Sequence, residues 1–222
     1  MTNNNIPYRP LELMLDPNMT RFDCQDFIAV WENFVPISFC NQLIEYFKEQ
    51  VDNNGSLYLP TNVEKRESLS YQKGEHQYDG ALRRKDEAIL LNYADNILAG
   101  NVNQFLMSCT QHYVHIFDQL RSTGLLSSDI KFQRTKPGGG YHLWHYEAGA
   151  LSHAARELVW MIYLNDLPDG EGETEFLYQR RRIKPTAGTV VIFPAGMTHV
   201  HKGNTVFTED KYIVTGWHIK AQ

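Results

Sequence analysis

The sequence predicts an α+β protein in which helices come first and a mainly β core follows. Residues 36–51 carry apolar side chains at helical spacing, and from about residue 129 short β-rich runs alternate with Gly, Pro, Asp and Asn. Such runs, separated by turn residues, are typical of an antiparallel sandwich or barrel. We therefore expect a single domain over residues 1–222, with an N-terminal arm and supporting helices in 1–128 and the β core in 129–222.

The N-terminal half is predicted to contain an arm, two helical regions and a long loop. The first thirty residues are polar and interrupted by proline, and they end in one strand within DFIAVWENF (26–34). Residues 36–51 form an amphipathic helix with a start signal. Residues 52–80 are polar, with Gly and Asn, and are a candidate lid. Residues 83–117 form a second helical region, which we expect Gly100 to divide.

The second half is predicted to form the strands of the β core. Each run is short, rich in β-branched and aromatic residues, and bounded by turn residues. The runs are residues 129–139, 141–147, 157–166, 173–179, 188–195 and 211–220.

Composition narrows the class of protein. Hydrophobic residues make up 42% of the 222, which is enough for a core, and the net charge of −5 offers no basic field for nucleic acid. Three scattered cysteines fit a reducing compartment. No apolar run approaches the roughly 18 residues of a membrane span, and the N-terminus lacks the pattern of a secretory signal. We expect a cytoplasmic protein without a nucleic-acid or membrane partner.

His145 and Glu147 are the first candidate site residues. Residues two apart on a strand point to the same face, so these two side chains project together. A histidine and a carboxylate from one strand, with a histidine from elsewhere, make a 2-His-1-carboxylate triad that leaves positions open on ferrous iron. Chance alone would supply about one such pair in this composition, so an ordinary strand pair is the alternative. His112 and His115 could also pair as ligands, but no carboxylate accompanies them.

Lys211 is the second candidate. In KYIVTGW, alternation places it on one face with Ile213, Thr215 and Trp217. A buried lysine is costly without an anionic partner. Two explanations are open: Lys211 extends to solvent at the barrel mouth, or it binds the carboxylate of a ligand.

Five ordered blocks in residues 129–219 carry a family resemblance. They are KPGGGYHLWHYE, VWMIYLND, EGETEF, IKPTAGTVVIFPAGMTH and KYIVTGW. This region resembles the iron(II)- and 2-oxoglutarate-dependent oxygenases of the prolyl 4-hydroxylase-like kind, most of all their phage and bacterial members. We therefore expect a phage-encoded protein of a bacterial host.

The resemblance implies a double-stranded β-helix (jelly roll) and the use of Fe(II), 2-oxoglutarate and dioxygen. By position in the motifs, it implies metal binding by one group of residues and 2-oxoglutarate binding by another. The metal group is His145, Glu147 and His199, and the 2-oxoglutarate group is Lys211, Tyr163, Thr215 and Trp217. One departure is that this chain has H-x-E where relatives usually have H-x-D.

The distal metal ligand is a choice between His199 and His201. Both lie in MTHVHKG, two residues apart, so alternation along a strand cannot separate them. The spacing to Lys211 is also ambiguous, being twelve residues from one and ten from the other. The short segment from Phe193 and Pro194 matches relatives better with His199, which we choose, with His201 near the pocket mouth.

The resemblance implies a hydroxylase that oxidises a C–H bond and releases succinate and CO2. The substrate is a peptide or protein residue, with peptidyl proline favoured, or a small molecule. A hypothesis from another class is a non-catalytic, metal-binding jelly-roll module. Incubating the protein with iron and 2-oxoglutarate and measuring succinate would distinguish the hydroxylase from the binding module.

Overall fold

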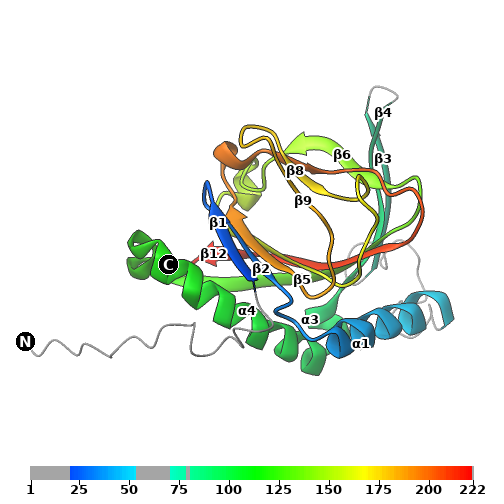
Figure 1. The fold of residues 1–222 in the computed structure, drawn as a ribbon, viewed down its shortest axis with the longest axis horizontal. Helices are drawn as coiled ribbons and strands as arrows, with labels where there is room; N and C mark the ends of the chain where they lie inside the picture. The colour runs from blue at the N-terminus through cyan, green and yellow to red at the C-terminus, as the bar shows by residue number, and fades with distance from the viewer. Residues whose placement is uncertain (1–20, 54–70, 79–80, 222) are drawn as a thin grey trace, which may run out of the picture.

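Strands from both halves of the chain join one curled sheet (Figure 1). The computed structural model describes residues 21–53, 71–78 and 81–221. The first half contributes β1 (Arg21–Gln25), β2 (Ile28–Glu32), β3 (Tyr71–Tyr78) and β4 (Ala81–Leu90). The second half contributes β5 (Leu125–Thr135), β6 (Gly140–His145), β7 (Arg156–Tyr163), β8 (Thr174–Phe176), β9 (Arg181–Ile183), β10 (Val190–Pro194), β11 (His201–Gly203) and β12 (Lys211–Lys220).

The sheet is antiparallel throughout and runs in the order β1-β2-β10-β7-β12-β5-β4-β6-β11-β8-β9, with β3 paired to β4. It curls so that β8, β6 and β11 lie across from β10, β7 and β12 (Figure 1). The helices α1 (Ile37–Lys48), α3 (Leu91–Ala94) and α4 (Asn96–Ile116) lie along one side of the curl. This arrangement confirms the prediction of a mainly β core with a helical annex.

Alternation along the central strands creates two cores. On β7, Leu158, Trp160 and Ile162 belong to a cluster that faces the helices, whereas Val159 and Met161 belong to a second cluster inside the curl. Successive side chains of a strand point to opposite faces, and both faces of β7 are covered. The continuous apolar run LVWMIYL is the sequence signature of a strand that is buried on both sides.

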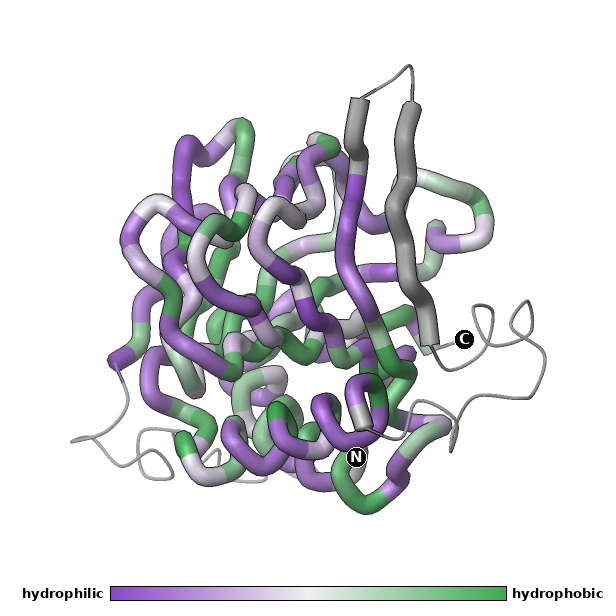
Figure 2. Tube along the Cα trace, turned by 90° about the vertical axis from the view of Figure 1, so that its right-hand side faces the viewer, coloured by the Kyte–Doolittle hydropathy of each residue, from purple (hydrophilic) through white to green (hydrophobic). Residues whose placement is uncertain are grey.

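The helices present one apolar face each to the sheet. In α1 the buried residues Cys40, Leu43, Ile44 and Phe47 recur every three or four positions. The helices below the barrel accordingly alternate between green and purple along their turns in Figure 2. Helix α4 begins after Asp95, whose side chain accepts hydrogen bonds from the backbone N–H groups of Ile97 and Leu98, both at 2.9 Å.

The predicted helix over 83–117 is partly wrong. Its first residues lie in β4, which pairs with β5 and β6, and α4 runs through Gly100 without interruption. Arg, Lys, Glu, Ala and Leu all favour helices, so local propensity pointed the wrong way. Pairing with β5 overrides it, since Glu87 lies opposite Arg134 and their side chains form a buried ion pair.

Two further expectations need revision. The one strand predicted within DFIAVWENF is present as β2, but residues 21–25, which were assigned to the arm, form β1. The two strands make a hairpin that turns at Asp26 and Phe27, which have φ values of 50° and 62°. The predicted loop 52–80 includes strand β3, and residues 54–70 lie outside the described residues, so the lid remains a prediction. Among the described helices, none is both long and apolar enough to cross a membrane.

Candidate active site

The inner face of the curl encloses a cavity of about 550 Å³. Strands β4, β5, β6, β7, β11 and β12 all contribute side chains to its wall. Five of the predicted site residues line it, namely His145, Glu147, Lys211, Thr215 and Trp217, and His201 lines it as well. The cavity is large enough for a small dicarboxylate together with part of a second molecule.

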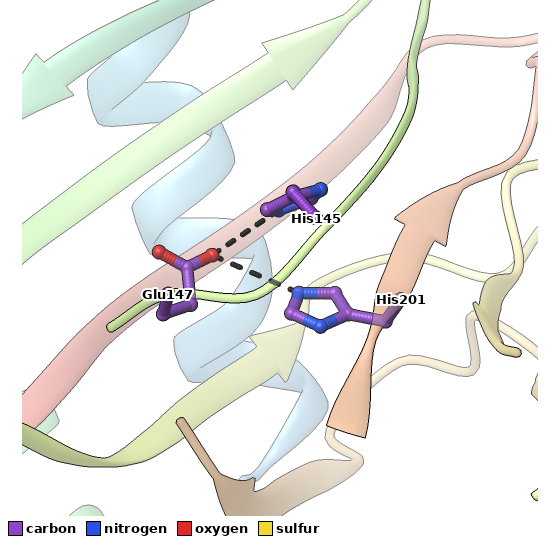
Figure 3. Close-up of side chains that lie close together, drawn as sticks. All are labelled: His145, Glu147 and His201. Atoms are coloured by element: carbon purple, nitrogen blue, oxygen red, sulfur yellow. Dashed lines mark ion pairs between the residues drawn. The ribbon is translucent and has the colours of Figure 1, made fainter. Parts of the chain in front are cut away.

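His145, Glu147 and His201 converge at one end of this cavity (Figure 3). His145 ends β6 and lies directly opposite His201, the first residue of β11, in the antiparallel register. Glu147 follows β6, and its backbone N–H donates to the carbonyl oxygen of Ala195 at 3.1 Å. Its Oε1 lies 3.3 Å from Nε2 of His145 and 3.7 Å from Nε2 of His201. This is a donor set that could hold a metal ion.

Backbone carbonyls fix the orientation of both imidazole rings. Nδ1 of His145 lies 2.8 Å from the carbonyl oxygen of Leu143, and Nδ1 of His201 lies 2.9 Å from that of His199. Carbonyl oxygens only accept, so each Nδ1 carries the proton and donates. Each Nε2 faces the carboxylate of Glu147, where it can donate a hydrogen bond if it carries a second proton or offer a lone pair to a cation if it does not. A divalent cation can take the place of two such protons, so the residues present fit a metal ion.

The carboxylate of Glu147 is held from its other side as well. Its Oε2 accepts hydrogen bonds from Nη1 of Arg156 and Nε1 of Trp217, both at 3.0 Å. Burial alone would raise the pKa of Glu147, but hydrogen bonds from His145 and His201 hold that pKa well below its usual value. The carboxylate is thus ionised, with one oxygen fixed and the other directed at the histidines.

His199, which the sequence analysis expected as a metal ligand, does not lie in this group. It lies in a short 3-10 turn (Met197–His199), and the strand begins only at His201. Both of its ring nitrogens are occupied, since Nε2 lies 2.8 Å from the carbonyl oxygen of Asp26 and Nδ1 lies 2.9 Å from Oγ1 of Thr198. The assumption that both histidines share one strand and one face is therefore wrong. His199 contacts the site through its carbonyl oxygen, which accepts a hydrogen bond from Nδ1 of His201.

Lys211 lies at the other end of the cavity, at the start of β12. It is 7% exposed, and its Nζ donates to the carbonyl oxygen of Gly172 at 2.5 Å. Burial lowers the pKa of Lys211 to about 8, although the charges of Asp86 and Glu173 oppose this effect. Among the described residues, no carboxylate forms an ion pair with it. Of the two explanations for a buried lysine, this geometry favours a ligand carboxylate.

The three remaining predicted residues have distinct positions. Tyr163 is fully buried behind the cavity wall, where its hydroxyl donates to Oγ1 of Thr174 at 2.7 Å, and its ring lies 5.4 Å from Nζ of Lys211. Thr215 lines the cavity and donates to the carbonyl oxygen of Trp160 at 2.7 Å. Trp217 lies beside the His-Glu-His group, as its bond to Glu147 shows.

Sequence reasoning missed Arg156 and Lys131. The guanidinium of Arg156 lies 3.5 Å above the Trp217 ring while it bonds Glu147. Lys131 occupies the inner face of β5 directly opposite Thr215. Lys131 alternates with Gln133 and Thr135, a signal similar to the one that identified Lys211. His112, by contrast, accepts a hydrogen bond from Nε1 of Trp31 at 3.1 Å and is a structural residue.

A curled antiparallel sheet with a His-Glu-His group inside it is an arrangement that can support metal-dependent oxidation. Residues 130–219 match the model of the 2OG-Fe(II) oxygenase superfamily. This match confirms the family resemblance that the sequence predicted for residues 129–219. The matched family model implies Fe(II), 2-oxoglutarate and dioxygen. A search of curated protein sequences found no match.

Solved structures extend the similarity to nearly the whole chain. The viral collagen prolyl hydroxylase of Paramecium Bursaria Chlorella virus-1, in complex with 2OG, is 18% identical, with a TM-score of 0.59 over 89% of this chain and 97% of that one. A Pseudomonas putida prolyl-4-hydroxylase is 18% identical, with a TM-score of 0.57 over 88% and 94%. A Trichoplax adhaerens prolyl hydroxylase, in complex with a hypoxia inducible factor peptide fragment, is 13% identical, with a TM-score of 0.61 over 88% and 84%. At these identities the likeness shows the fold, and it confirms the double-stranded β-helix.

Proposed function

We propose that His145, Glu147 and His201 hold Fe(II), with His201 in the place that the sequence analysis gave to His199. The observation that carries this proposal is that one ligand atom from each of the three residues lies within 4.8 Å of the other two. Each imidazole donates its other N–H to a carbonyl oxygen, which is the usual support of a metal-bound histidine. Glu147 supplies the negative charge, and Arg156 and Trp217 position it.

We propose that the ammonium of Lys211 binds the far carboxylate of 2-oxoglutarate. Three observations support this role. Lys211 is buried, it has no carboxylate partner among the described residues, and it lies some distance along β12 from Trp217. A charge-assisted hydrogen bond in a partly dry pocket is worth about 1.5–3 kcal/mol. Tyr163 supports the site from behind by its contact with Thr174, which does line the cavity.

The reaction that this arrangement supports is hydroxylation of a C–H bond. Iron, when bound, supplies the coupled oxidation in which 2-oxoglutarate and dioxygen become succinate and CO2, while one oxygen atom enters the substrate. The protein's residues fix the cosubstrate at Lys211, orient the metal ligands through carbonyl and Arg156 contacts, and exclude water with the apolar side chains of Val159 and Met161.

A peptide or protein residue is the substrate that we propose, with peptidyl proline as the first candidate. The names of the structural neighbours, which are prolyl hydroxylases, support this choice. A small-molecule substrate is the alternative within the same reaction class, and a metal-binding module without turnover is the alternative outside it.

Succinate release tests the proposal. The protein with Fe(II), ascorbate and 2-oxoglutarate should produce succinate, because these oxygenases turn over slowly without substrate, and a proline-rich peptide should accelerate it. The matched control is Lys211→Ala, which should keep the metal and lose most of the succinate at low 2-oxoglutarate. Metal binding without any succinate, with or without peptides, would favour the binding module.

A further inference from the structure

A second buried lysine, Lys131, points into the cavity at the metal end. It is 8% exposed and lines the cavity wall from β5. Its register partner on β12 is Thr215, two residues before Trp217, whose indole bonds Glu147. Lys211 lies four residues away on β12, which corresponds to about 13 Å at a rise of about 3.3 Å per residue. The two lysines therefore mark opposite ends of one pocket.

The acidic groups around Lys131 are already occupied by other partners. Asp86 accepts two hydrogen bonds from Nε of Arg84, at 2.9 and 2.8 Å, and one from Nε2 of Gln133 at 2.8 Å. Glu147 is shared among the two histidines, Arg156 and Trp217. Within the described residues, Nζ of Lys131 forms neither an ion pair nor a hydrogen bond.

A buried ammonium without a partner is unfavourable, and an anion of a ligand removes the penalty. Burial lowers the pKa of Lys131 to about 8, so the ammonium is still mostly charged at neutral pH. Arg84 and Arg156 add positive potential nearby, as their opposing effect on the same pKa indicates. The site therefore selects a negatively charged group, and Lys131 offers its ammonium from the wall of the cavity.

We propose that Lys131 binds a carboxylate at the metal end of the pocket, separate from the carboxylate at Lys211. This inference rests on the proposed function. Two sources can supply the group: the carboxylate next to the 2-oxo group of the cosubstrate, or an acidic group of the molecule that is oxidised. In the second case the substrate carries its acid close to the oxidised carbon, as a small amino acid or an acidic side chain does, and an uncharged peptidyl proline does not.

Binding measurements on the Mn(II)-loaded protein test this inference and identify the source. Lys131→Met keeps the length of the side chain and removes the charge, and Lys131→Arg is the matched control that keeps it. Titrations use 2-oxoglutarate and 2-oxobutyrate, which lacks the far carboxylate. Acetate is then added to the Mn(II)–2-oxoglutarate complex, where relaxation of its methyl protons by Mn(II) reports binding in the pocket.

Each outcome either supports the proposal and identifies the source of the carboxylate or overturns the proposal. If the group belongs to the cosubstrate, Lys131→Met weakens both 2-oxo acids by roughly tenfold to a hundredfold, and Lys131→Arg weakens them less. If the carboxylate belongs to the substrate, the affinities for both 2-oxo acids stay unchanged in Lys131→Met. Acetate then binds to the wild type and to Lys131→Arg but not to Lys131→Met. Unchanged 2-oxo acid affinities with no Lys131-dependent acetate binding overturn the proposal. An unaltered protein that binds no Mn(II) or no 2-oxoglutarate contradicts the proposed function itself, and this inference with it.

Discussion

The two faces of the curled sheet use neighbouring residues of the same strands for different purposes. On β5, Phe132 packs against Phe47 with ring centroids 4.8 Å apart on the helix side, whereas Lys131 and Gln133 face the cavity. On β12, Val214 is buried on the helix side, and Thr215 lines the cavity. The helix side is mainly apolar, apart from polar groups that are paired, such as Arg134 with Glu87, and it supplies stability. The cavity side buries charged groups at a cost in stability and supplies binding. Because successive residues of a strand point to opposite faces, neighbouring residues of β5 and β12 serve stability on one face and ligand binding on the other.

The largest expected effect lies on the helix side. Phe132→Ala should lower the free energy of unfolding by about 3–5 kcal/mol, because it removes a fully buried ring and leaves a cavity. Denaturant unfolding measures the loss. Phe132→Leu should cost less, and the folded fraction of either variant should bind Mn(II) like the wild type. A variant that keeps its stability but loses the metal would break the division between the faces.

On the cavity side, Glu147→Gln should weaken Mn(II) binding by more than about a hundredfold, since it removes a ligand and not merely a supporting contact. Stability should fall little. Glu147→Asp keeps the charge and should retain more affinity, although its shorter side chain approaches the histidines less closely.

Electron paramagnetic resonance titration with Mn(II) compares the two Glu147 variants. An equal loss in both would contradict this expectation and would mean that the longer side chain, with its contacts to Arg156 and Trp217, is required. Unchanged affinity in Glu147→Gln would remove this carboxylate from the metal site.

A smaller effect is expected at the far end of the cavity. Lys211→Ala should weaken 2-oxoglutarate by roughly tenfold to a hundredfold, in line with one lost charge-assisted hydrogen bond. Mn(II) affinity without 2-oxoglutarate should stay the same, because Lys211 does not touch the His-Glu-His group. Isothermal titration calorimetry measures both. Equal 2-oxoglutarate affinity in variant and wild type would exclude Lys211 as the anchor.

The smallest effect concerns pH. The charged form of Lys211 is the binding form, and its pKa in the free protein is lowered to about 8. Affinity for 2-oxoglutarate should therefore be constant below pH 8 and fall by at most about tenfold per pH unit above it. Lys211→Arg keeps its charge to much higher pH and should abolish this decline. A decline that persists in Lys211→Arg would point to Lys131, whose pKa is lowered to a similar value.

The sequence predicted the β core well because its strands are locally consistent. The run around Trp160 and the VVIF run near Phe193 are apolar on both faces, and glycine and proline bound them. The segment 83–90 was assigned to a helix because its strand character comes from β5, β6 and the Arg134 ion pair, which lie far away in sequence. The intrinsic propensities of the side chains contain no information about pairing with strands that are distant in sequence.

The site was predictable where residues lie on regular strands and not where the chain turns. His145 and Lys211 are both at strand ends, and alternation placed them correctly in the cavity. The choice of His199 over His201 assumed a strand where a 3-10 turn exists, and the structure gathers His201, not His199, with His145 and Glu147. Lys131 escaped notice because nothing in the sequence shows that Asp86 and Glu147 are occupied by other partners.

The central claim is that His201, and not His199, completes the His-Glu-His metal site, and Mn(II) binding by a matched pair of variants tests it most directly. His201→Ala should lose most of its Mn(II) affinity while unfolding like the wild type. His199→Ala removes the contacts with Asp26 and Thr198, so it should lose stability but retain Mn(II) binding in its folded fraction. The opposite pattern, with metal lost in His199→Ala and kept in His201→Ala, would contradict the account.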